Sequence, residues 1–294
     1  MTPDSAPVHV ALVTHAGLSE LDPDDRGLPA AFAAAGARAG IAVWDDPEVD
    51  WAGFDAVLLR SPWDYFRKLP AFLAWGERVA AATRLVNPWP LVRWNLDKRY
   101  LVELGERGAP VVPTVLAEEG TRFDLAAVLA ARGWRRAIVK PAVSADSWET
   151  HAVDAASLPT AQGHLDRLLA ERAMLVQPFL EAVESAGERS LVFLDGAYSH
   201  AIRKNALTHG GRWAGLPEGV PVEPSTDERA AAERILALAC PDLPLYARVD
   251  LVHDERGEPR LLELELVEPT LFFTTCPGSA ERFVAALLRR LGAS

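Results

Sequence analysis

Short apolar runs alternate with helical stretches over the first part of the chain, and this alternation limits the possible folds more than any other feature. Val8 to Val13 is an apolar run, and small and apolar residues then recur at helical spacing over residues 28–39. Further runs follow at 41–44, 56–59 and 85–86, with an amphipathic helix at 69–82. Strands that alternate with helices pair in parallel. We expect a parallel-sheet α/β domain over residues 1–90, with ligand-facing loops after its strands.

The rest of the chain predicts two α+β subdomains. The first, residues 91–178, starts with a helix near Asn95 and continues with strands and helices at 111–116, 123–131, 137–140, 165–173 and 174–177. The second, residues 179–294, has strand-like runs at 190–194, 197–203, 245–252 and 260–267 and helices at 226–239 and 279–291. Asp195-Gly196 and a turn containing Arg256-Gly257 predict hairpins, so this last sheet should be antiparallel.

Composition excludes several classes of protein. A formal net charge of −11 argues against binding to a nucleic-acid backbone, which requires a broad basic surface. Cys240 and Cys276 lie in unrelated contexts, so neither a disulfide framework nor a zinc site is indicated. We find no apolar run of about 18 residues and no signal peptide. The sequence therefore predicts a cytoplasmic protein with neither nucleic-acid nor membrane partners.

Two strands near the carboxyl end place charged residues on one face. Period-two alternation puts Arg248 with Asp250, and Glu263 with Glu265. If the 254–258 turn joins these strands, three carboxylates and one guanidinium share a surface, and the carboxylates repel one another unless a cation lies among them. Carboxylate oxygens suit Mg²⁺ or Mn²⁺. The alternative is a solvated polar face on an edge hairpin. Glu268 falls on the opposite phase and receives no role.

Lysine is rare, because only four of the 30 basic residues are lysines: Lys68, Lys98, Lys140 and Lys204. A compact ammonium suits a crowded phosphate in a way that the planar guanidinium does not. Lys140 ends a strand and precedes small polar residues whose backbone N–H groups can fold over phosphates. The apolar strand 174–177 leads into a proline-containing hinge whose backbone edge can hold an adenine ring. The alternatives are surface lysines and an ordinary core strand.

The order of these pieces resembles that of the ATP-grasp ligases, whose near relatives here include glutathione synthetase and D-alanine:D-alanine ligase. The resemblance spans nearly the whole chain, and its marks are Asp97-Lys98, Val-Lys140-Pro, the Gln177 hinge, Gly-Glu188-x-Ser, Arg248-Val-Asp250 and Glu263-Leu-Glu265. Glu265 stands where these ligases usually have asparagine. The loop Ser144 to Trp148 lacks the glycines usual in their phosphate loops. The resemblance implies an ATP-grasp fold, in which a parallel-sheet domain precedes two subdomains that clamp ATP.

A narrower resemblance is to the branch that contains the O-ureido-serine cyclo-ligase of D-cycloserine biosynthesis. Its marks are Arg60-Ser-Pro-Trp63-Asp-Tyr65, Asn87-Pro88, Arg93-Trp-Asn95-Leu-Asp97-Lys98, Lys140-Pro-Ala-Val-Ser144 and Leu264-Glu-Leu-Val-Glu-Pro-Thr-Leu-Phe-Phe.

The resemblance implies roles for individual residues. Lys98 and Lys140 would bind ATP phosphates, and Lys140 would also act in catalysis. Residues around the adenine would be Gln177, Pro178, Phe179 and Leu180, while Glu188 would take the ribose hydroxyls. Asp250, Glu263 and Glu265 would hold two Mg²⁺ ions, and Arg248 would stabilise charge that develops during the reaction. Arg60, Ser61 and Trp63 follow a strand of the first domain and are candidates for substrate contact, with packing at a domain interface as the alternative for Trp63. Arg203 and Lys204 are candidates to clamp a substrate carboxylate or the γ-phosphate, with simple surface charge as the alternative.

The implied reaction forms an amide-type bond through an acyl-phosphate. In the cyclo-ligase version, the attacking nitrogen and the activated carboxyl belong to one O-ureido-serine-like amino acid. An intermolecular ligase with two substrates and a non-catalytic nucleotide-binding module are the alternatives. The expected cofactors are ATP and Mg²⁺ or Mn²⁺, and the expected partners are a small amino-acid-like substrate and a second copy of the chain in a homodimer.

Overall fold

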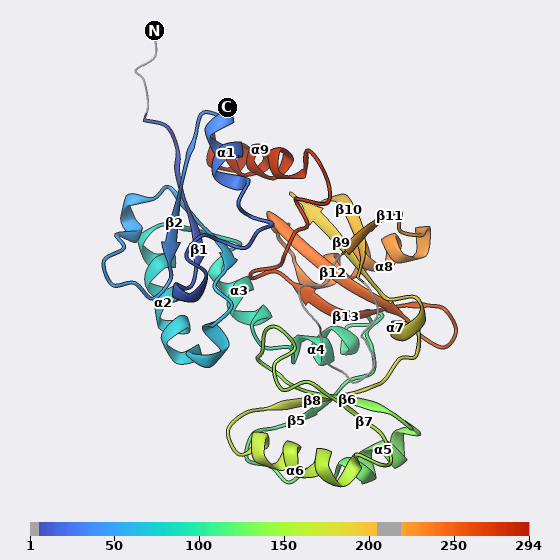
Figure 1. Cartoon of the computed structure of the whole chain (residues 1–294). Coiled ribbons are helices and arrows are strands. Elements are labelled where there is room, and N and C mark those ends of the chain that lie inside the picture. Colours follow the sequence, from blue (N-terminus) through green and yellow to red (C-terminus); the bar gives the residue numbers. More distant parts are fainter. Residues whose placement is uncertain (1–5, 205–218, 294) are drawn as a thin grey trace.

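The first sheet is parallel, as the alternation predicts. The computed structural model describes residues 6–204 and 219–293 and contains three sheets (Figure 1). The first has the order β2-β1-β3-β4, and its strands are β1 (His9–Thr14), β2 (Arg38–Val43), β3 (Ala56–Ser61) and β4 (Arg84–Val86). Its helices are α1 (Leu28–Ala34) and α2 (Leu69–Ala82), with 3-10 turns η1 (Ala16–Leu18), η2 (Trp51–Gly53) and η3 (Tyr65–Arg67). The helix predicted over 28–39 is shorter because Gly36, at φ +75°, ends it before β2.

The second sheet is small and antiparallel. It has the order β5-β8-β6-β7, with β5 (Val115–Ala117), β6 (Ala137–Pro141), β7 (His151–Val153) and β8 (Met174–Pro178). Two helices cover its outer face, α5 (Leu125–Arg132) and α6 (Leu158–Leu169) (Figure 1). The predicted helix at 165–173 is wrong in its bounds, because α6 begins at Leu158 with a proline in its first turn. Helices α3 (Trp89–Asn95) and α4 (Tyr100–Glu106) connect the first two sheets.

The third sheet is antiparallel and carries the two charged strands. Its order is β11-β10-β9-β12-β13, with β9 (Glu188–Leu194), β10 (Ala197–Lys204), β11 (Gly219–Val222), β12 (Tyr246–His253) and β13 (Pro259–Glu265). The helices around it are α7 (Ala182–Ser185), α8 (Thr226–Ala239) and α9 (Ser279–Leu291). Both predicted hairpins form, since β9 pairs with β10 and β12 pairs with β13.

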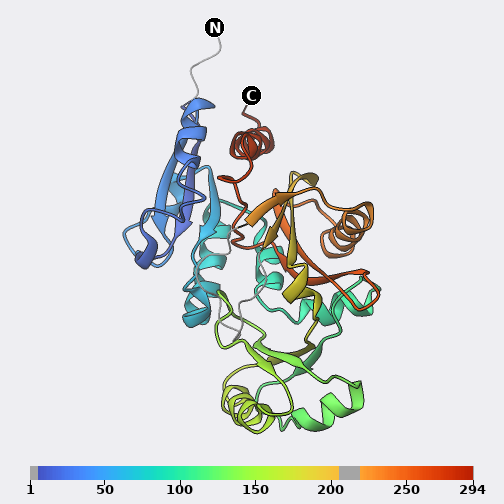
Figure 2. The ribbon, with the colours of Figure 1, turned by 45° about the vertical axis from the view of Figure 1, so that its right-hand side comes forward.

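The last helix joins the two ends of the chain. Helix α9 lies beside α1 (Figures 1 and 2), and Phe283 and Leu287 share one apolar cluster with Leu28 and Phe32. This packing joins the first and third sheets, while the second sheet lies apart from them on the other side of α4 (Figure 1). Among the described residues, no helix combines the length and apolarity needed to cross a membrane.

Candidate active site

A cleft of about 910 Å³ is lined by residues from all three sheets and their loops. The second sheet contributes Lys140 and the 177–180 hinge, and the third contributes β12 and β13. Trp63 reaches the cleft from the loop after β3. The cleft therefore combines the segments that the sequence marked as chemically important.

The strands β12 and β13 present their charged residues as the alternation predicts. In the antiparallel register, Arg248 lies opposite Glu265 and Asp250 lies opposite Glu263. All four residues line the cleft. The alternative of a solvated polar face is wrong, because Arg248 and Asp250 are buried, with Asp250 only 1% exposed.

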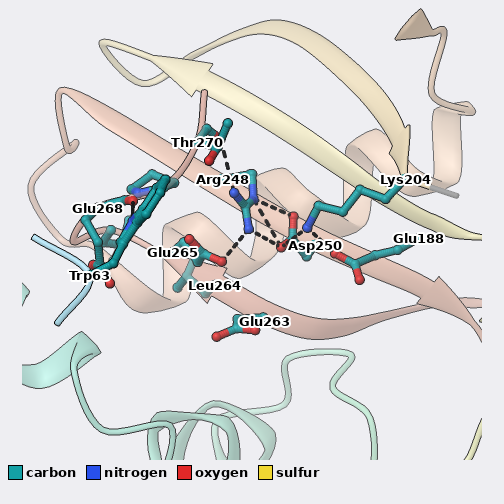
Figure 3. A network of polar contacts seen from close by, with 12 residues as sticks. Trp63, Glu188, Lys204, Arg248, Asp250, Glu263, Leu264, Glu265, Glu268 and Thr270 are labelled. Carbon is teal, nitrogen blue, oxygen red and sulfur yellow. Dashed lines mark hydrogen bonds and ion pairs between the residues drawn. The ribbon is translucent and has the colours of Figure 1, made fainter. Parts of the chain in front are cut away.

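Arg248 is fixed by several acceptors (Figure 3). Its Nε donates to Asp250 Oδ1 at 2.9 Å, and its Nη2 donates to Asp250 Oδ2 at 2.9 Å and contacts Glu265. Its Nη1 donates to the carbonyl oxygen of Thr270 at 3.1 Å. Burial raises the pKa of Asp250, but Arg248 and Lys204 outweigh burial and hold that pKa well below its usual range. Burial raises the pKa of Glu265 to about 7 despite Arg248.

Lys204 bridges two carboxylates on neighbouring strands. Its Nζ donates to Glu188 Oε1 at 2.5 Å and to Asp250 Oδ2 at 2.9 Å. Burial raises the pKa of Glu188 to about 7. Gly187 precedes this carboxylate at φ +71°, and a Cβ there would lie 2.3 Å from the carbonyl oxygen of Lys204. Only glycine fits this approach, which brings Glu188 opposite Lys204 across the β9–β10 pair.

Two further lysines face the carboxylates, Lys140 from the second sheet and Lys98 from the turn between α3 and α4. Lys98 Nζ donates to the carbonyl oxygen of Ser144 at 2.6 Å and lies 3.2 Å from Glu263 Oε1. Burial raises the pKa of Glu263, but Lys98 and Lys140 together lower it below its usual value. Lys140 is 8% exposed, and it forms no ion pair within the part of the chain that the structure describes. Burial lowers its pKa, so its ammonium would gain from an anionic ligand.

The outer edge of β13 pairs with the backbone near Val111 at Leu261, and beyond that point side chains hold it in place of another strand. Asn95 donates from Nδ2 to the carbonyl oxygen of Leu264 at 2.9 Å and accepts from the N–H of Leu266 at 2.8 Å. The Tyr100 hydroxyl accepts from the N–H of Leu264 and donates to the same carbonyl, both at 2.9 Å. These bonds satisfy the backbone on both sides of Glu265, and they fix the strand that carries Glu263.

Comparison with known proteins decides the family. A cycloserine biosynthesis protein, DcsG from Streptomyces lavendulae, is 40% identical over 302 aligned residues, which cover 96% of this chain and 98% of that protein. The family model for the N-terminal domain of the D-cycloserine synthetase DcsG matches residues 10–87. This chain belongs to the DcsG family of ATP-grasp ligases. The predicted ATP-grasp resemblance and fold are thereby confirmed.

Solved structures agree with membership in the DcsG family. The crystal structure of the D-cycloserine synthetase DcsG has a TM-score of 0.90 at 39% identity and covers 96% of this chain and 99% of its own. The ATP-grasp ligase PsnB, complexed with a minimal precursor, has a TM-score of 0.67 at 19% identity, covering 96% of this chain and 99% of its own. PsnB shares the fold alone.

Most site residues predicted from the sequence line the cleft. They are Trp63, Lys98, Lys140, Gln177, Pro178, Phe179, Leu180, Glu188, Lys204, Arg248, Asp250, Glu263 and Glu265. Arg203 does not, because neighbouring residues of a strand point to opposite faces and Lys204 takes the cleft side.

Arg60 and Ser61 correct the sequence-based prediction, since the structure does not bring them to the cleft. Both are 0% exposed at the end of β3, a central strand of the first sheet. Arg60 Nε donates to Asp25 Oδ1 at 3.0 Å, and its Nη2 donates to the carbonyl oxygen of Pro269 at 2.8 Å. Ser61 donates to Thr14 Oγ1 at 3.1 Å. Arg60 therefore ties the first sheet to the segment after β13 and lies outside the cleft lining.

The sequence analysis gave no role to three acidic residues that the structure places in the cleft lining. Glu268, Asp22 and Asp24 all line the cleft. Glu268 was placed on the opposite phase by extending the alternation of β13, but that strand ends at Glu265, so the alternation does not continue. Burial, followed by repulsion from Glu265, raises the pKa of Glu268 to about 8. Asp22 and Asp24 lie between β1 and α1, in the loop region where the parallel sheet predicts ligand contacts.

The glycine-poor loop after Lys140 adopts a glycine-like backbone. Asp146 and Ser147 have φ values of +51° and +52°, and both line the cleft. L-residues in this region carry strain of about 1–3 kcal/mol each, which clusters at functional sites. The loop therefore lies against the cleft without the glycines that usually permit such a path.

We predict that Arg60→Met destabilises the protein by about 3–5 kcal/mol, because it leaves the buried Asp25 without its partner. The double variant Arg60→Met, Asp25→Asn should lose less than Arg60→Met alone. Urea unfolding of the parent and the variants measures both free energies. Parent-like stability of Arg60→Met together with a raised substrate KM would restore the substrate role that the sequence suggested.

Proposed function

We propose that this chain is an ATP- and Mg²⁺-dependent cyclo-ligase that acts on an O-ureido-serine-like amino acid. The observation that carries the proposal is the full-length similarity to a cycloserine biosynthesis protein, combined with a cleft in which Asp250, Glu263 and Glu265 face Lys140 and Arg248. Carboxylate oxygens next to positive charge are the groups that phosphoryl transfer requires.

The proposed reaction has two bond-forming steps. A carboxylate oxygen of the substrate attacks the γ-phosphorus of ATP, and ADP leaves with the electron pair of the broken P–O bond. The ureido nitrogen then attacks the resulting acyl-phosphate, phosphate leaves, and an isoxazolidinone ring closes. The attacking nitrogen gives up its proton to solvent as the ring closes. Water then cleaves the bond between this nitrogen and the carbamoyl group, which leaves as carbamic acid and breaks down to carbon dioxide and ammonia, and the ring nitrogen takes up a proton.

The carboxylates on β12 and β13 fit a divalent metal. Asp250, Glu263 and Glu265 offer hard oxygen donors on one face, which suits Mg²⁺ or Mn²⁺. Magnesium bound there would offset phosphate charge and align the transferred group. Since the resemblance to ATP-grasp ligases assigns these three carboxylates to two ions, we propose two.

The chain's own residues would orient the nucleotide. Lys98 and Lys140 would neutralise its phosphates, the 177–180 hinge would flank adenine, and Glu188 would accept hydrogen bonds from the ribose hydroxyls. Arg248 is already fixed by Asp250 and Thr270, so its guanidinium can stabilise charge on the acyl-phosphate without reorganising. The division of the chain into the units 1–90, 91–178 and 179–294 stays a prediction. A homodimeric assembly and a cytoplasmic location stay predictions as well.

Substrate requirement tests the proposal directly. We expect ADP release from Mg-ATP with an O-ureido-serine enantiomer as the sole second substrate, and one ring product for each ADP. ADP formation that requires a separate amine would indicate the intermolecular ligase instead. Absence of ADP with every carboxylate tested would contradict a catalytic role.

We predict that Glu263→Gln separates binding from turnover. The variant keeps the size of the side chain but removes a charge from the metal face, and this charge matters most in the charge-dense transition state. Nucleotide affinity should stay within about tenfold, roughly 1.4 kcal/mol. Turnover should fall at least about a hundredfold, roughly 2.7 kcal/mol of barrier.

Glu265→Asn is the matched control for Glu263→Gln, because asparagine is the residue that other ATP-grasp ligases carry there and it keeps a carbonyl oxygen. Its loss of turnover should be milder. Near-normal turnover of Glu263→Gln, or a larger defect in Glu265→Asn, would contradict the assignment of the metal to this strand.

A further inference from the structure

Three metal-ligating side chains meet outside the catalytic carboxylates, at the end of the loop that follows Lys140. Glu149 lies in this loop, His151 begins β7, and His164 lies on α6 (Figure 1). One ligand atom from each of the three residues lies within 4.8 Å of those of the other two. The proposed ligase reaction uses none of these residues.

The distances between the ligand atoms of these side chains fit metal coordination better than direct hydrogen bonding. Glu149 Oε2 lies 3.6 Å from His151 Nε2 and 3.5 Å from His164 Nδ1. Hydrogen bonds between such atoms are about 2.7–3.2 Å long. Ligand atoms about 2.1 Å from a tetrahedral zinc ion lie about 3.4 Å from one another. The two distances from Glu149 to the histidines are therefore close to those between tetrahedral ligands.

The hydrogen bonds of His164 leave its Nδ1, the ring nitrogen 3.5 Å from Glu149 Oε2, without a proton. Its Nε2 lies 3.4 Å from the carbonyl oxygen of Glu149, an acceptor, so the ring proton belongs on Nε2. Arg167 Nη2, which can only donate, lies 3.2 Å from His164 Nδ1. Burial and the nearby His151 lower the pKa of His164 and favour its neutral form. A histidine that ligates metal typically donates its other N–H in this way.

The guanidinium of Arg167 supplies positive charge next to two of the three side chains. It lies 3.2 Å from Glu149 Oε1 as well as near His164 Nδ1, so it balances two groups that both present lone pairs. Its side chain is 60% exposed, whereas that of His164 is 13% exposed. The guanidinium can therefore turn into solvent when another cation takes its position.

We propose that Glu149, His151 and His164 form a binding site for a divalent transition-metal ion of the zinc class. Two imidazole nitrogens and one carboxylate oxygen suit Zn²⁺ or Co²⁺, with water completing the coordination, whereas Mg²⁺ prefers oxygen ligands. The bound ion would join the end of the phosphate-side loop to α6. Since Asp146, Ser147 and Thr150 of this region line the cleft, the ion would restrain one wall of it.

The test is a titration of the full, tag-free chain with CoCl₂ and ZnCl₂ after treatment with a chelator. Excess MgCl₂ and ADP keep the carboxylates of β12 and β13 occupied. We expect one equivalent to bind by calorimetry, with Co²⁺ absorption bands of a low-symmetry, nitrogen-containing site. His151→Ala and His164→Ala should each weaken binding at least tenfold, and Arg167→Ala should tighten it because no guanidinium must be displaced.

His253→Ala is the matched control, since His253 lies on β12 beside Glu228 and should bind the metal as the parent does. Circular dichroism checks that each variant is folded. Absence of binding by the folded parent, or binding that neither His151→Ala nor His164→Ala weakens, would overturn the proposal. Both outcomes are independent of ligase activity, so they leave the proposed function untouched.

Discussion

The buried contact between Asp250, Arg248 and Lys204 is the interaction on which the rest of the cleft depends. Asp250 is 1% exposed, and an unpaired buried carboxylate costs several kcal/mol, so both cations are needed to keep it charged. The same demand explains how lysine is used. Lys98, Lys140 and Lys204 are buried in the cleft, while Lys68 is exposed and pairs with Asp45 and Asp64. Lysine thus persists mainly where a compact charge faces carboxylates and the proposed phosphates.

Side chains that imitate a strand connect the helices to this charged face. Asn95 and Tyr100 bond the backbone of Leu264, which lies between Glu263 and Glu265, and Lys98 from the same segment contacts Glu263 itself. Asn87 similarly donates to the carbonyl oxygens of Tyr246 and Leu266, both at 2.9 Å. The segment from Asn87 to Tyr100 therefore positions the proposed metal ligands through backbone hydrogen bonds. This gives a physical reason for the motif Asn95-Leu-Asp-Lys98.

Sequence reasoning succeeded where local periodicity persists. Alternation along β12 and β13 placed Arg248, Asp250, Glu263 and Glu265 on one face, because both strands are regular there. It failed for Glu268, where the strand has already ended. Arg60 was expected in the loop after the run 56–59, but β3 continues to Ser61 and buries it. The cluster around His164 depends on the packing of α6 against β7, and no spacing along the chain reveals it. Side-chain contacts between distant elements were the part that the sequence could not supply.

The central claim is that the charged face of β12 and β13 serves to activate a carboxylate with ATP. Its most direct test follows the transfer of oxygen from the substrate to phosphate. The measurement uses O-ureido-serine labelled with ¹⁸O in its carboxyl group, unlabelled ATP and Mg²⁺, and mass analysis of the phosphate released. We predict one ¹⁸O atom in each phosphate formed, because the P–O bond made in activation is kept when the ring closes. Unlabelled phosphate released together with ring product would contradict it.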